Sequence, residues 1–200
     1  MSTPNAGAGA EASPAMSCVQ RLVPADADAY RAFMLEAYAR HPRAYTSGAE
    51  EREALPLAWW QARLAEGDRP VQLVLALRCD GALAGVAGLA FETRPRLRHK
   101  ALLFGMCVVA PQRRSGIGRR LVEALLAQAW ARDGVEQVQL NVTQGNTAAQ
   151  ALYEGCGLRA WGVEPHAVAL GSGYLAKIHM ACARAVVAPD RGGGASASPA

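Results

Sequence analysis

The segment "VVAPQRRSGIGRRL", from Val108 to Leu121, places four arginines and two glycines between an apolar run and an amphipathic one. A loop that leads from a strand into a helix presents unpaired backbone N–H groups and the positive end of the helix dipole. Gly116 and Gly118 allow the backbone there to approach a ligand closely. We therefore predict that this segment binds an anion, and a phosphate or pyrophosphate is the best match.

The spacing of the segment excludes two other nucleotide-binding loops. A Walker loop ends in Gly-Lys-Ser/Thr, whereas Gly118 is followed by Arg119 and Arg120, so no hydroxyl is placed for magnesium. A dinucleotide-binding loop needs a third glycine, where this chain has Leu121. It also needs an acid at the end of the next strand, and Glu136 instead stands at the start of that strand.

Apolar runs on both sides of the loop predict seven strands. Two of them are joined by Asp80-Gly81, which is the strongest short signal for a hairpin. The seven strands are predicted at 18–23, 71–79, 82–92, 99–110, 135–142, 158–164 and 174–183.

Four helices are predicted from apolar residues at helical spacing, at 24–41, 56–67, 116–132 and 146–157. A helix connects the fourth and fifth strands, so those two strands should be parallel. The fold class is α/β in the broad sense (α+β). It is one domain with a mixed, mostly antiparallel sheet of about seven strands and helices on both faces.

The length and composition indicate one globular domain. The 200 residues suffice for one substantial core and are too few for two ordinary domains with tails. Apolar residues make up 51% and charged residues 19%, which is close to the usual balance. We expect a disordered leader at 1–16, the domain at 17–184 and a disordered tail at 185–200.

Several classes of function are disfavoured on the same grounds. No apolar run is long enough to cross a bilayer, and the N-terminus lacks the features of a secretory signal. Five widely spaced cysteines without a CxxC pair are typical of thiols in a reducing cytoplasm. The net charge of +4 is concentrated at 94–100 and 113–120, which argues against a nucleic-acid partner. We therefore expect a cytoplasmic protein that binds no membrane, nucleic acid or metal.

The loop and its surroundings resemble the GNAT superfamily of N-acetyltransferases. The pyrophosphate loop of that family follows Gln/Arg-x-x-Gly-x-Gly/Ala, which "RRSGIG" at 113–118 matches. The later segment "GNTAAQALYEGCGL", at 145–158, carries the family's Asn, its Leu-Tyr-Glu and its glycine-containing end. Together with the order of elements, the resemblance covers about 19–182.

The resemblance implies an acetyl-CoA site without a metal. The loop amides from Arg114 to Arg119 would hold the pyrophosphate, and the edge of the fourth strand would pair with the pantetheine arm. The backbone N–H of Val108 would stabilise the oxyanion, and Asn146 would position the pantetheine. The implied cofactor-binding residues are Met106, Val108, Arg113, Arg114, Ser115, Gly116, Ile117, Gly118, Arg119, Asn146 and Tyr153.

The family transfers the acetyl group directly from thioester to amine, without a covalent enzyme intermediate. Tyr153 stands at the family's position for the general acid that protonates the leaving thiolate, and an ordinary packing role is the alternative. Cys107 has no histidine partner in the sequence pattern, so we predict an ordinary buried thiol there.

The general base stays open at the level of sequence. Family members often carry a glutamate on or beside the fourth strand, whereas "ALLFGMCVV" at 101–109 has no acid. Glu92, His99 and His166 are candidates, although each also fits a solvated surface group. A chain of waters, or loss of the proton to solvent, would serve as well.

The charge of the acceptor is equally open. Glutamates within 50–53, followed by the tryptophans at 59–60, would suit a cationic amine. The same residues also fit a solvated helix start and a tryptophan core. The basic segment at 94–100 would instead guide an anionic acceptor or contact the CoA phosphates, unless it is only a solvated hairpin loop.

The prediction is an acetyl-CoA-dependent N-acetyltransferase that acts on a primary amine of a small molecule, amino acid derivative or peptide. One alternative is a protein N-terminal or lysine acetyltransferase, which needs a groove open to a chain. Another is a CoA-sensing module with weak or no catalysis. Many members of the family form dimers, so the resemblance also implies a homodimer.

Overall fold

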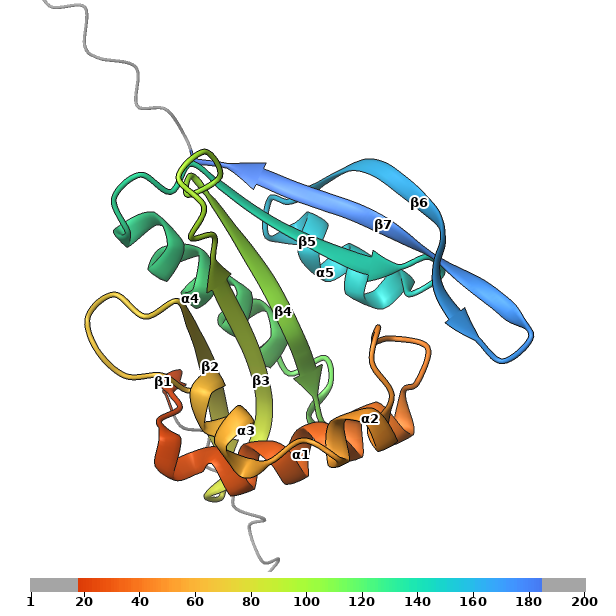
Figure 1. Ribbon diagram of the computed structural model, residues 1–200, viewed down its shortest axis with the longest axis horizontal. Coiled ribbons are helices and arrows are strands. Elements are labelled where there is room, and N and C mark those ends of the chain that lie inside the picture. The colour runs from red at the N-terminus through yellow and green to blue at the C-terminus, as the bar shows by residue number, and fades with distance from the viewer. Residues whose placement is uncertain (1–17, 185–200) are drawn as a thin grey trace, which may run out of the picture.

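The computed structural model describes residues 18–184, so the predicted leader at 1–16 and the predicted tail at 185–200 both lie outside the described residues. Those residues form one seven-stranded sheet in the order β1-β2-β3-β4-β5-β7-β6 (Figure 1). All neighbouring strands are antiparallel except β4 and β5, which are parallel. The predicted fold class, with its parallel pair, is confirmed.

The strands are β1 (Gln20–Arg21), β2 (Gln72–Cys79), β3 (Ala82–Phe91), β4 (Lys100–Val108), β5 (Gln137–Thr143), β6 (Arg159–Leu170) and β7 (Gly173–Ala183). The helices are α1 (Ala27–Arg40), α2 (Ala49–Glu53), α3 (Leu57–Arg63), α4 (Ile117–Ala131) and α5 (Thr147–Gly155). Short 3-10 turns at Pro24–Asp26 and Ala110–Gln112 precede α1 and α4.

The hairpin between β2 and β3 forms where the sequence predicts it. Asp80 has φ 49° and Gly81 has φ 81°. Two-residue hairpin turns of type I′ need positive φ at both central residues, which Asp-Gly tolerates well. This turn sets the register that pairs Cys79 with Ala82.

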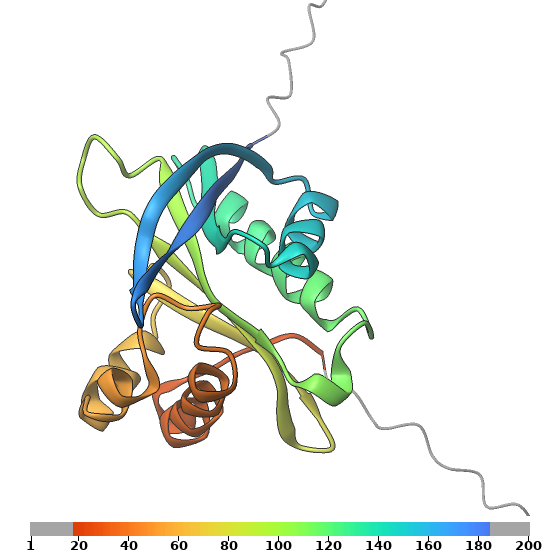
Figure 2. The same cartoon turned by 90° about the vertical axis from the view of Figure 1, so that its right-hand side faces the viewer.

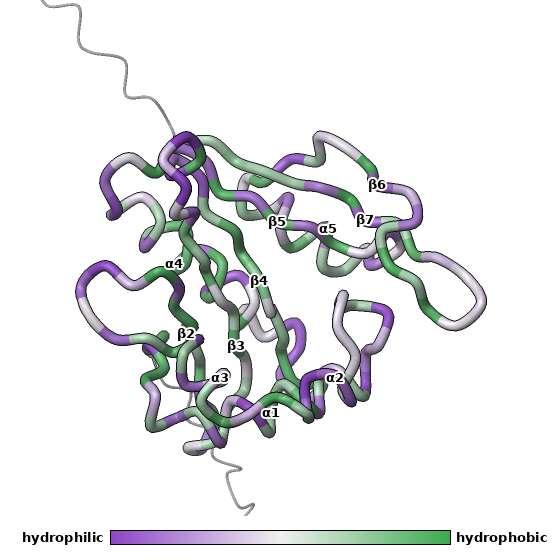
Figure 3. The backbone as a smooth tube through the Cα atoms, viewed as in Figure 1, coloured by the Kyte–Doolittle hydropathy of each residue, from purple (hydrophilic) through white to green (hydrophobic). Residues whose placement is uncertain are grey.

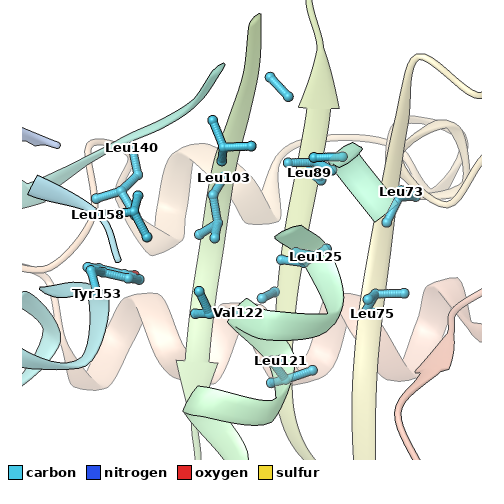
Figure 4. Close-up of a cluster of buried hydrophobic side chains, with 14 of the residues drawn as sticks. Leu73, Leu75, Leu89, Leu103, Leu121, Val122, Leu125, Leu140, Tyr153 and Leu158 are labelled. Carbon is cyan, nitrogen blue, oxygen red and sulfur yellow. The ribbon is translucent and has the colours of Figure 1, made fainter. Parts of the chain in front are cut away.

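Two hydrophobic clusters lie on opposite faces of the sheet, and helices cover each of them (Figure 2). The larger cluster joins α4 and α5 to β2–β5, and Figure 4 shows its side chains. The smaller one joins α1 and α3 to β2 and β3, with Tyr30 and Trp60 fully buried against each other. In Figure 3 the apolar colour follows the central strands, whereas polar colour gathers in the connecting loops.

The parallel pairing of β4 with β5 is short. Only Lys100, Ala101 and Leu102 pair with Gln137, Val138 and Gln139, and the two strands then diverge. A bulge in β4 accompanies this divergence: Val86 and Gly88 are two positions apart on β3, whereas their partners Cys107 and Phe104 are three positions apart on β4. Gly105 within the bulge has φ 61°, which favours glycine.

Two elements differ from the prediction. Helix α2 was not predicted, because five residues are too few to show a helical period. Strand β6 continues six residues beyond its predicted end at Glu164, through Pro165 and His166 with its φ of 56°. This is an edge strand with an irregular register at that point, and edges accommodate proline. Within the described residues no helix is both long and apolar enough to span a bilayer.

Candidate active site

A cavity of about 1120 Å³ fills the gap between the diverging ends of β4 and β5. Its lining residues come from both faces of the sheet. Met106 and Val108 pack toward the α4 side, while Cys107 between them packs toward the α1 side. The wall comes from three regions, namely the loop after α1, the end of β4 with the loop into α4, and the end of β5 with the start of α5.

The start of α4 opens into this cavity. Gly116 is the N-cap with φ 85°, and no side chain caps the helix. The amide of Arg120 donates to the Gly116 carbonyl at 3.0 Å, so Ile117, Gly118 and Arg119 hold the first three helical positions. Amides at these positions have no acceptor within their own helix and carry the positive end of its dipole. The start of α4 therefore presents backbone amides to the cavity, which is the arrangement that the predicted anion site requires.

Two of the arginines around the loop are held in place by hydrogen bonds. Arg113 donates from Nε to the Val108 carbonyl at 3.2 Å, and its guanidinium lies 2.6 Å from Nε2 of His41. Arg119 donates to the carbonyl of Gly155 at 3.0 Å and so joins α4 to the end of α5. These two side chains hold the walls of the cavity in place.

The α5 side of the cavity is built by close packing. A Cβ on Gly118 would lie 3.0 Å from Leu152, so glycine lets the two helices approach. The Oδ1 of Asn146 accepts from the amide of Ala149 at 3.3 Å and caps α5. Its amide nitrogen is the group of this side chain that is left for a ligand.

The edge of β4 faces the gap with its backbone. The amide of Val109 donates to Ala84 of β3 at 3.0 Å. Because amides alternate in direction along a strand, the N–H of Val108 points the opposite way, into the gap. Tyr45, from the loop after α1, donates its hydroxyl to the Met106 carbonyl at 3.2 Å.

Tyr153 lies behind the cavity wall. Its side chain is 6% exposed and belongs to the larger hydrophobic cluster, beside Leu140 and Leu158 (Figure 4). Its neighbour Leu152 lines the cavity. Burial raises the pKa of Tyr153, so the phenol stays protonated at any physiological pH.

The candidate bases Glu92 and His99 do not reach the cavity. Both lie beside Lys100, at the start of β4, whereas the cavity lies at its end near Val108. Nine strand residues span about 26 Å, so proton transfer over that distance is excluded. Glu92 instead forms an ion pair with Arg94, which lowers the pKa of its carboxyl to about 2. These two predictions are corrected.

In the region between α1 and α3, residues 41–45 line the cavity, whereas the glutamates at 50–53 and the tryptophans at 59–60 do not, and neither does the basic segment at 94–100. The glutamates of α2 are exposed, and Trp60 is buried in the smaller cluster. The basic segment at 94–100 lies with Glu92 at the far end of the sheet. His166, another candidate base, is stacked on Tyr174 at the outer end of the β6–β7 hairpin. The contacts of these residues fit the alternatives given above, namely solvated surface groups and a tryptophan in the core.

The structure adds four residues that the sequence pattern did not single out. His41, Tyr45 and Thr143 line the cavity, and Lys177 contacts Thr143 from behind. The available signal for Lys177 was a lone charge inside the apolar run "YLAKIHMACA". The others stand in loops or at strand ends, where no periodicity marks them.

The charged side chains that line the cavity are all basic. Its lining, within the part of the chain that the structure describes, contains arginines from both the α1 and α4 sides and no Asp or Glu. The described residues also contain no group of three or more His, Cys, Asp or Glu side chains placed to hold a metal. The wall therefore suits an anionic ligand.

The sheet is therefore divided, and a helix start and a strand edge both face the gap. The sequence model of the acetyltransferase (GNAT) family matches residues 32–158, which is well over half of the chain. The chain belongs to that family.

Curated relatives and solved structures agree with this assignment. Mycothiol acetyltransferase from Salinispora arenicola is 30% identical over 137 residues, and its counterpart from Salinispora tropica is 29% identical over 138 residues. Each match covers 68% of this chain and 42% of the relative, so the chain spans about two fifths of the length of these relatives.

The solved structures share the fold at low identity. A GNAT acetyltransferase from Streptococcus pneumoniae has a TM-score of 0.70 at 20% identity, covering 85% of this chain and all of that one. The ribosomal-protein-alanine N-acetyltransferase from Brucella melitensis has a TM-score of 0.68 at 23% identity, covering 84% and 100%. The protein yncA from Salmonella typhimurium, described with its cofactor acetyl-CoA, has a TM-score of 0.67 at 20% identity, covering 88% and 98%.

Proposed function

We propose that this chain is an acetyl-CoA-dependent N-acetyltransferase that transfers an acetyl group to a primary amine by direct attack on the thioester. The observation that carries the proposal is the cavity between β4 and β5, which is lined by residues from both faces of the sheet. Acetyl-CoA enters from the α4 side, and the amine enters from the α1 side.

The cosubstrate is held mainly by backbone groups in this proposal. The amides from Arg114 to Arg119 surround the pyrophosphate at the start of α4. Arg114 has φ 65°, and its positive φ beside that of Gly116 turns successive amides toward one point. The pantetheine arm pairs with the free edge of β4 at Met106 and Val108 and meets the amide of Asn146.

The transition state is stabilised by the amide of Val108. As the amine attacks, negative charge develops on the thioester oxygen, and an N–H already aimed into the gap stabilises it without reorganising. Tyr153 protonates the leaving thiolate after a small shift of Leu152, as the family resemblance implies. Cys107 takes no covalent part, because burial raises the pKa of its thiol above the ordinary value.

The acceptor in this proposal is a primary amine on a small molecule, amino acid derivative or peptide. Two relatives are named for mycothiol, and one structural neighbour is named for the alanine of a ribosomal protein. A cavity without lining carboxylates, within the described residues, favours an acceptor that carries an anionic group beside its amine. A peptide with an N-terminal amine and a nearby carboxylate is the second candidate.

The cell compartment and oligomeric state belong to the same proposal. Free thiols at Cys79, Cys107, Cys156 and Cys182 support a reducing cytoplasm. Exposed Trp161 and Tyr174 on β6 and β7 support a homodimer formed through these late strands.

The first experiment is thermal melting of the purified chain with acetyl-CoA, CoA, ATP or NAD. A ligand at about 100 times its dissociation constant adds roughly 2.7 kcal/mol, which raises the midpoint by several degrees. We expect acetyl-CoA and CoA alone to do so. Stabilisation by ATP or NAD and none by CoA would contradict the proposed function.

The second experiment follows CoA thiol release with a panel of amines at equal concentration. The panel contains glucosamine, phenethylamine, spermidine, alaninamide and a hexapeptide with N-terminal alanine and an acidic third residue. Release with at least one amine is expected, with mass spectrometry showing the acetylated product. Binding of acetyl-CoA without release in any reaction would favour the CoA-sensing alternative.

A further inference from the structure

Lys177 is a buried lysine at the end of the cavity, on β7. Its side chain is 3% exposed. Its Nζ lies 2.8 Å from Oγ1 of Thr143, on β5, and 3.4 Å from the carbonyl oxygen of Ala44, in the loop after α1. Strand pairing places Lys177 directly opposite Thr143.

No carboxylate within the described residues forms an ion pair with this lysine. Glu164, on β6, is also opposite Lys177, but its carboxylate lies 2.9 Å from Nε2 of His179. Burial without a counter-charge lowers the pKa of Lys177, because the ammonium loses its hydration. A neutral amine with an available lone pair therefore forms more readily here than on the surface.

Lys177 stands on the acceptor side of the sheet. On β5 and β7, Val142, Ile178 and Met180 pack into the cluster under α4 and α5. Side chains alternate between faces along a strand, so Thr143 and Lys177 point to the opposite face, toward the loop after α1.

The groups around Lys177 on that face come from several elements. Lys177 itself contacts the Ala44 carbonyl of the loop after α1, and the cavity in front of Thr143 is lined by Tyr45 and the exposed Arg43 of the same loop and by Cys107 of β4. Tyr45 remains a neutral phenol, because burial raises its pKa, with smaller effects from Cys107 and other neighbours. Thr143 lines the cavity beside these groups, so its hydroxyl connects the cavity with Lys177.

His41 is the other base within reach of the cavity, and its geometry suits the task less well. Its Nε2 lies 2.6 Å from the guanidinium of Arg113, which can only donate. The lone pair of Nε2 therefore accepts the hydrogen bond from Arg113, and Nδ1 carries the proton, so neither ring nitrogen has a lone pair for the acceptor amine.

We propose that Thr143 and Lys177 form the proton-accepting pair for the acceptor amine, with the Thr143 hydroxyl facing the amine and Lys177 receiving the proton behind it. This inference rests on the proposed N-acetyltransferase function. It supplies the base that the strand β4 lacks. Lys177 acts through Thr143 and does not itself touch the acceptor.

The proton balance of the step is simple. The amine nitrogen forms a bond to the thioester carbon, and collapse of the adduct breaks the carbon–sulfur bond and releases the CoA thiolate. The nitrogen gives its extra proton to Thr143 Oγ1 while the original hydroxyl proton passes to Nζ of Lys177. Lys177 leaves the step as an ammonium and returns the proton to solvent before the next turnover.

The sequence permits a direct test, because Lys100 and Lys177 are the only lysines in the chain. Lysine labelled with ¹³C at Cε gives two NMR signals, which the variant Lys100→Arg assigns. We expect the Lys177 signal to titrate at clearly lower pH than the Lys100 signal. Titration of both lysines together would overturn the proposal without any activity assay.

The kinetic test uses Lys177→Met and Lys177→Arg with the panel amine that the wild type turns over fastest. Arginine keeps the positive charge but cannot accept a proton, so both variants should lose about 10²-fold in kcat at pH 7. KM for acetyl-CoA should stay within twofold, and the rise of wild-type kcat through the pKa of Lys177 should disappear. Lys100→Arg is the matched control and should keep wild-type kinetics.

Threonine variants test the relay itself. Thr143→Val removes the hydroxyl and should lower kcat like Lys177→Met, whereas Thr143→Ser keeps it and should restore most of the rate. Full activity of Lys177→Arg would mean that the charge alone matters and would overturn the proton role. Equal activity of Thr143→Val and Thr143→Ser would overturn the relay.

Stability provides a check on folding and on the sign of the pKa shift. Between the lowered folded-state pKa and the unfolded value of about 10.4, the unfolded chain binds more protons than the folded chain. Wild-type stability therefore rises with pH through that window, and Lys177→Met lacks this contribution. The melting midpoint of the wild type, measured relative to that of Lys177→Met, should rise between pH 7 and pH 10. A fall in this difference would contradict the assignment.

The failure of the inference and the failure of the proposed function give different results. Absence of CoA binding or of transfer by the wild type overturns the proposed function, and the role of Lys177 falls with it. Transfer by the wild type with an unchanged pH profile in Lys177→Arg overturns the role of Lys177 alone.

Discussion

Tyr45 and Tyr153 are two phenols on different sides of the divided sheet. Tyr45 lines the cavity on the α1 side and donates to the Met106 carbonyl. Tyr153 is buried under the α5 wall. Burial raises the pKa of both, so each is protonated when a thiolate leaves. The position of each hydroxyl, and not its acidity, decides which one acts.

Replacing Tyr153 by Phe tests the general-acid assignment. We expect kcat to fall by about 10²-fold, because the thiolate then leaves without a proton donor. The melting shift with acetyl-CoA should stay the same. Rates of thiol release, measured beside those of the matched variant Tyr45→Phe, check this. A wild-type rate for Tyr153→Phe and a slow rate for Tyr45→Phe would transfer the role to Tyr45.

At the scale of elements, the residue that caps α5 has a structural function and a proposed ligand-binding one. The Asn146 side chain caps the helix with its oxygen and lines the cavity, so its nitrogen is available to the proposed cosubstrate. The same helix carries Leu152 against Gly118 and ends at Gly155, which accepts from Arg119. The position of α5 therefore depends on α4 as well as on its own cap.

Two variants of Asn146 separate these functions. Asn146→Ser keeps a cap acceptor but loses the amide, so stability should be nearly unchanged while acetyl-CoA binds more weakly. Asn146→Ala loses both and should cost about 1 kcal/mol of unfolding free energy as well. Denaturant unfolding and calorimetric titration with acetyl-CoA give the two quantities. Undiminished affinity in Asn146→Ser would remove Asn146 from the pantetheine site.

At the scale of the whole molecule, the sheet consists of two parts joined by a short seam. Strands β1–β4 form one part and β5–β7 the other, and only three residue pairs connect β4 with β5 (Figure 1). The contacts between α4 and α5 close the seam on one face. A ligand in the gap therefore contacts both parts at once.

Hydrogen exchange with and without acetyl-CoA should show this bridging. Binding should slow exchange at 106–119 and at 143–152, on both sides of the gap. The loop at 93–99, at the far end of β4, serves as the internal control and should exchange at the same rate. Protection of that loop, with none at 113–119, would contradict the placement of the cosubstrate.

The order of elements and the anion-binding loop could be predicted because their signals are local. Alternating or helical periods mark most strands and helices, and Asp80-Gly81 marks the β2–β3 turn. Gly116 marks a backbone with positive φ, and Gly118 marks the place where α4 comes close to Leu152 of α5. Helix α2 was not predicted because it is too short to show a helical period. The extension of β6 was not predicted because it continues through a proline.

The proposed base could not be predicted from the sequence, because its position depends on which distant segments meet. Glu92 and His99 have suitable chemistry, but the direction of β4 carries them about 26 Å from the cavity. Lys177 is 34 residues from Thr143 and 133 from Ala44, and strand pairing brings all three together.

The sequence by itself determined the family, the order of the elements and the position of the loop for which an anion is proposed, since each follows from local patterns in the chain. The tertiary structure alone decided that β4 and β5 part after three residue pairs, that Tyr153 is buried and that Lys177 lies against Thr143. The physical reason is that burial and proximity arise from packing among segments far apart in the chain. Burial and proximity in turn change the pKa of Lys177 and leave the edge of β4 open to a ligand.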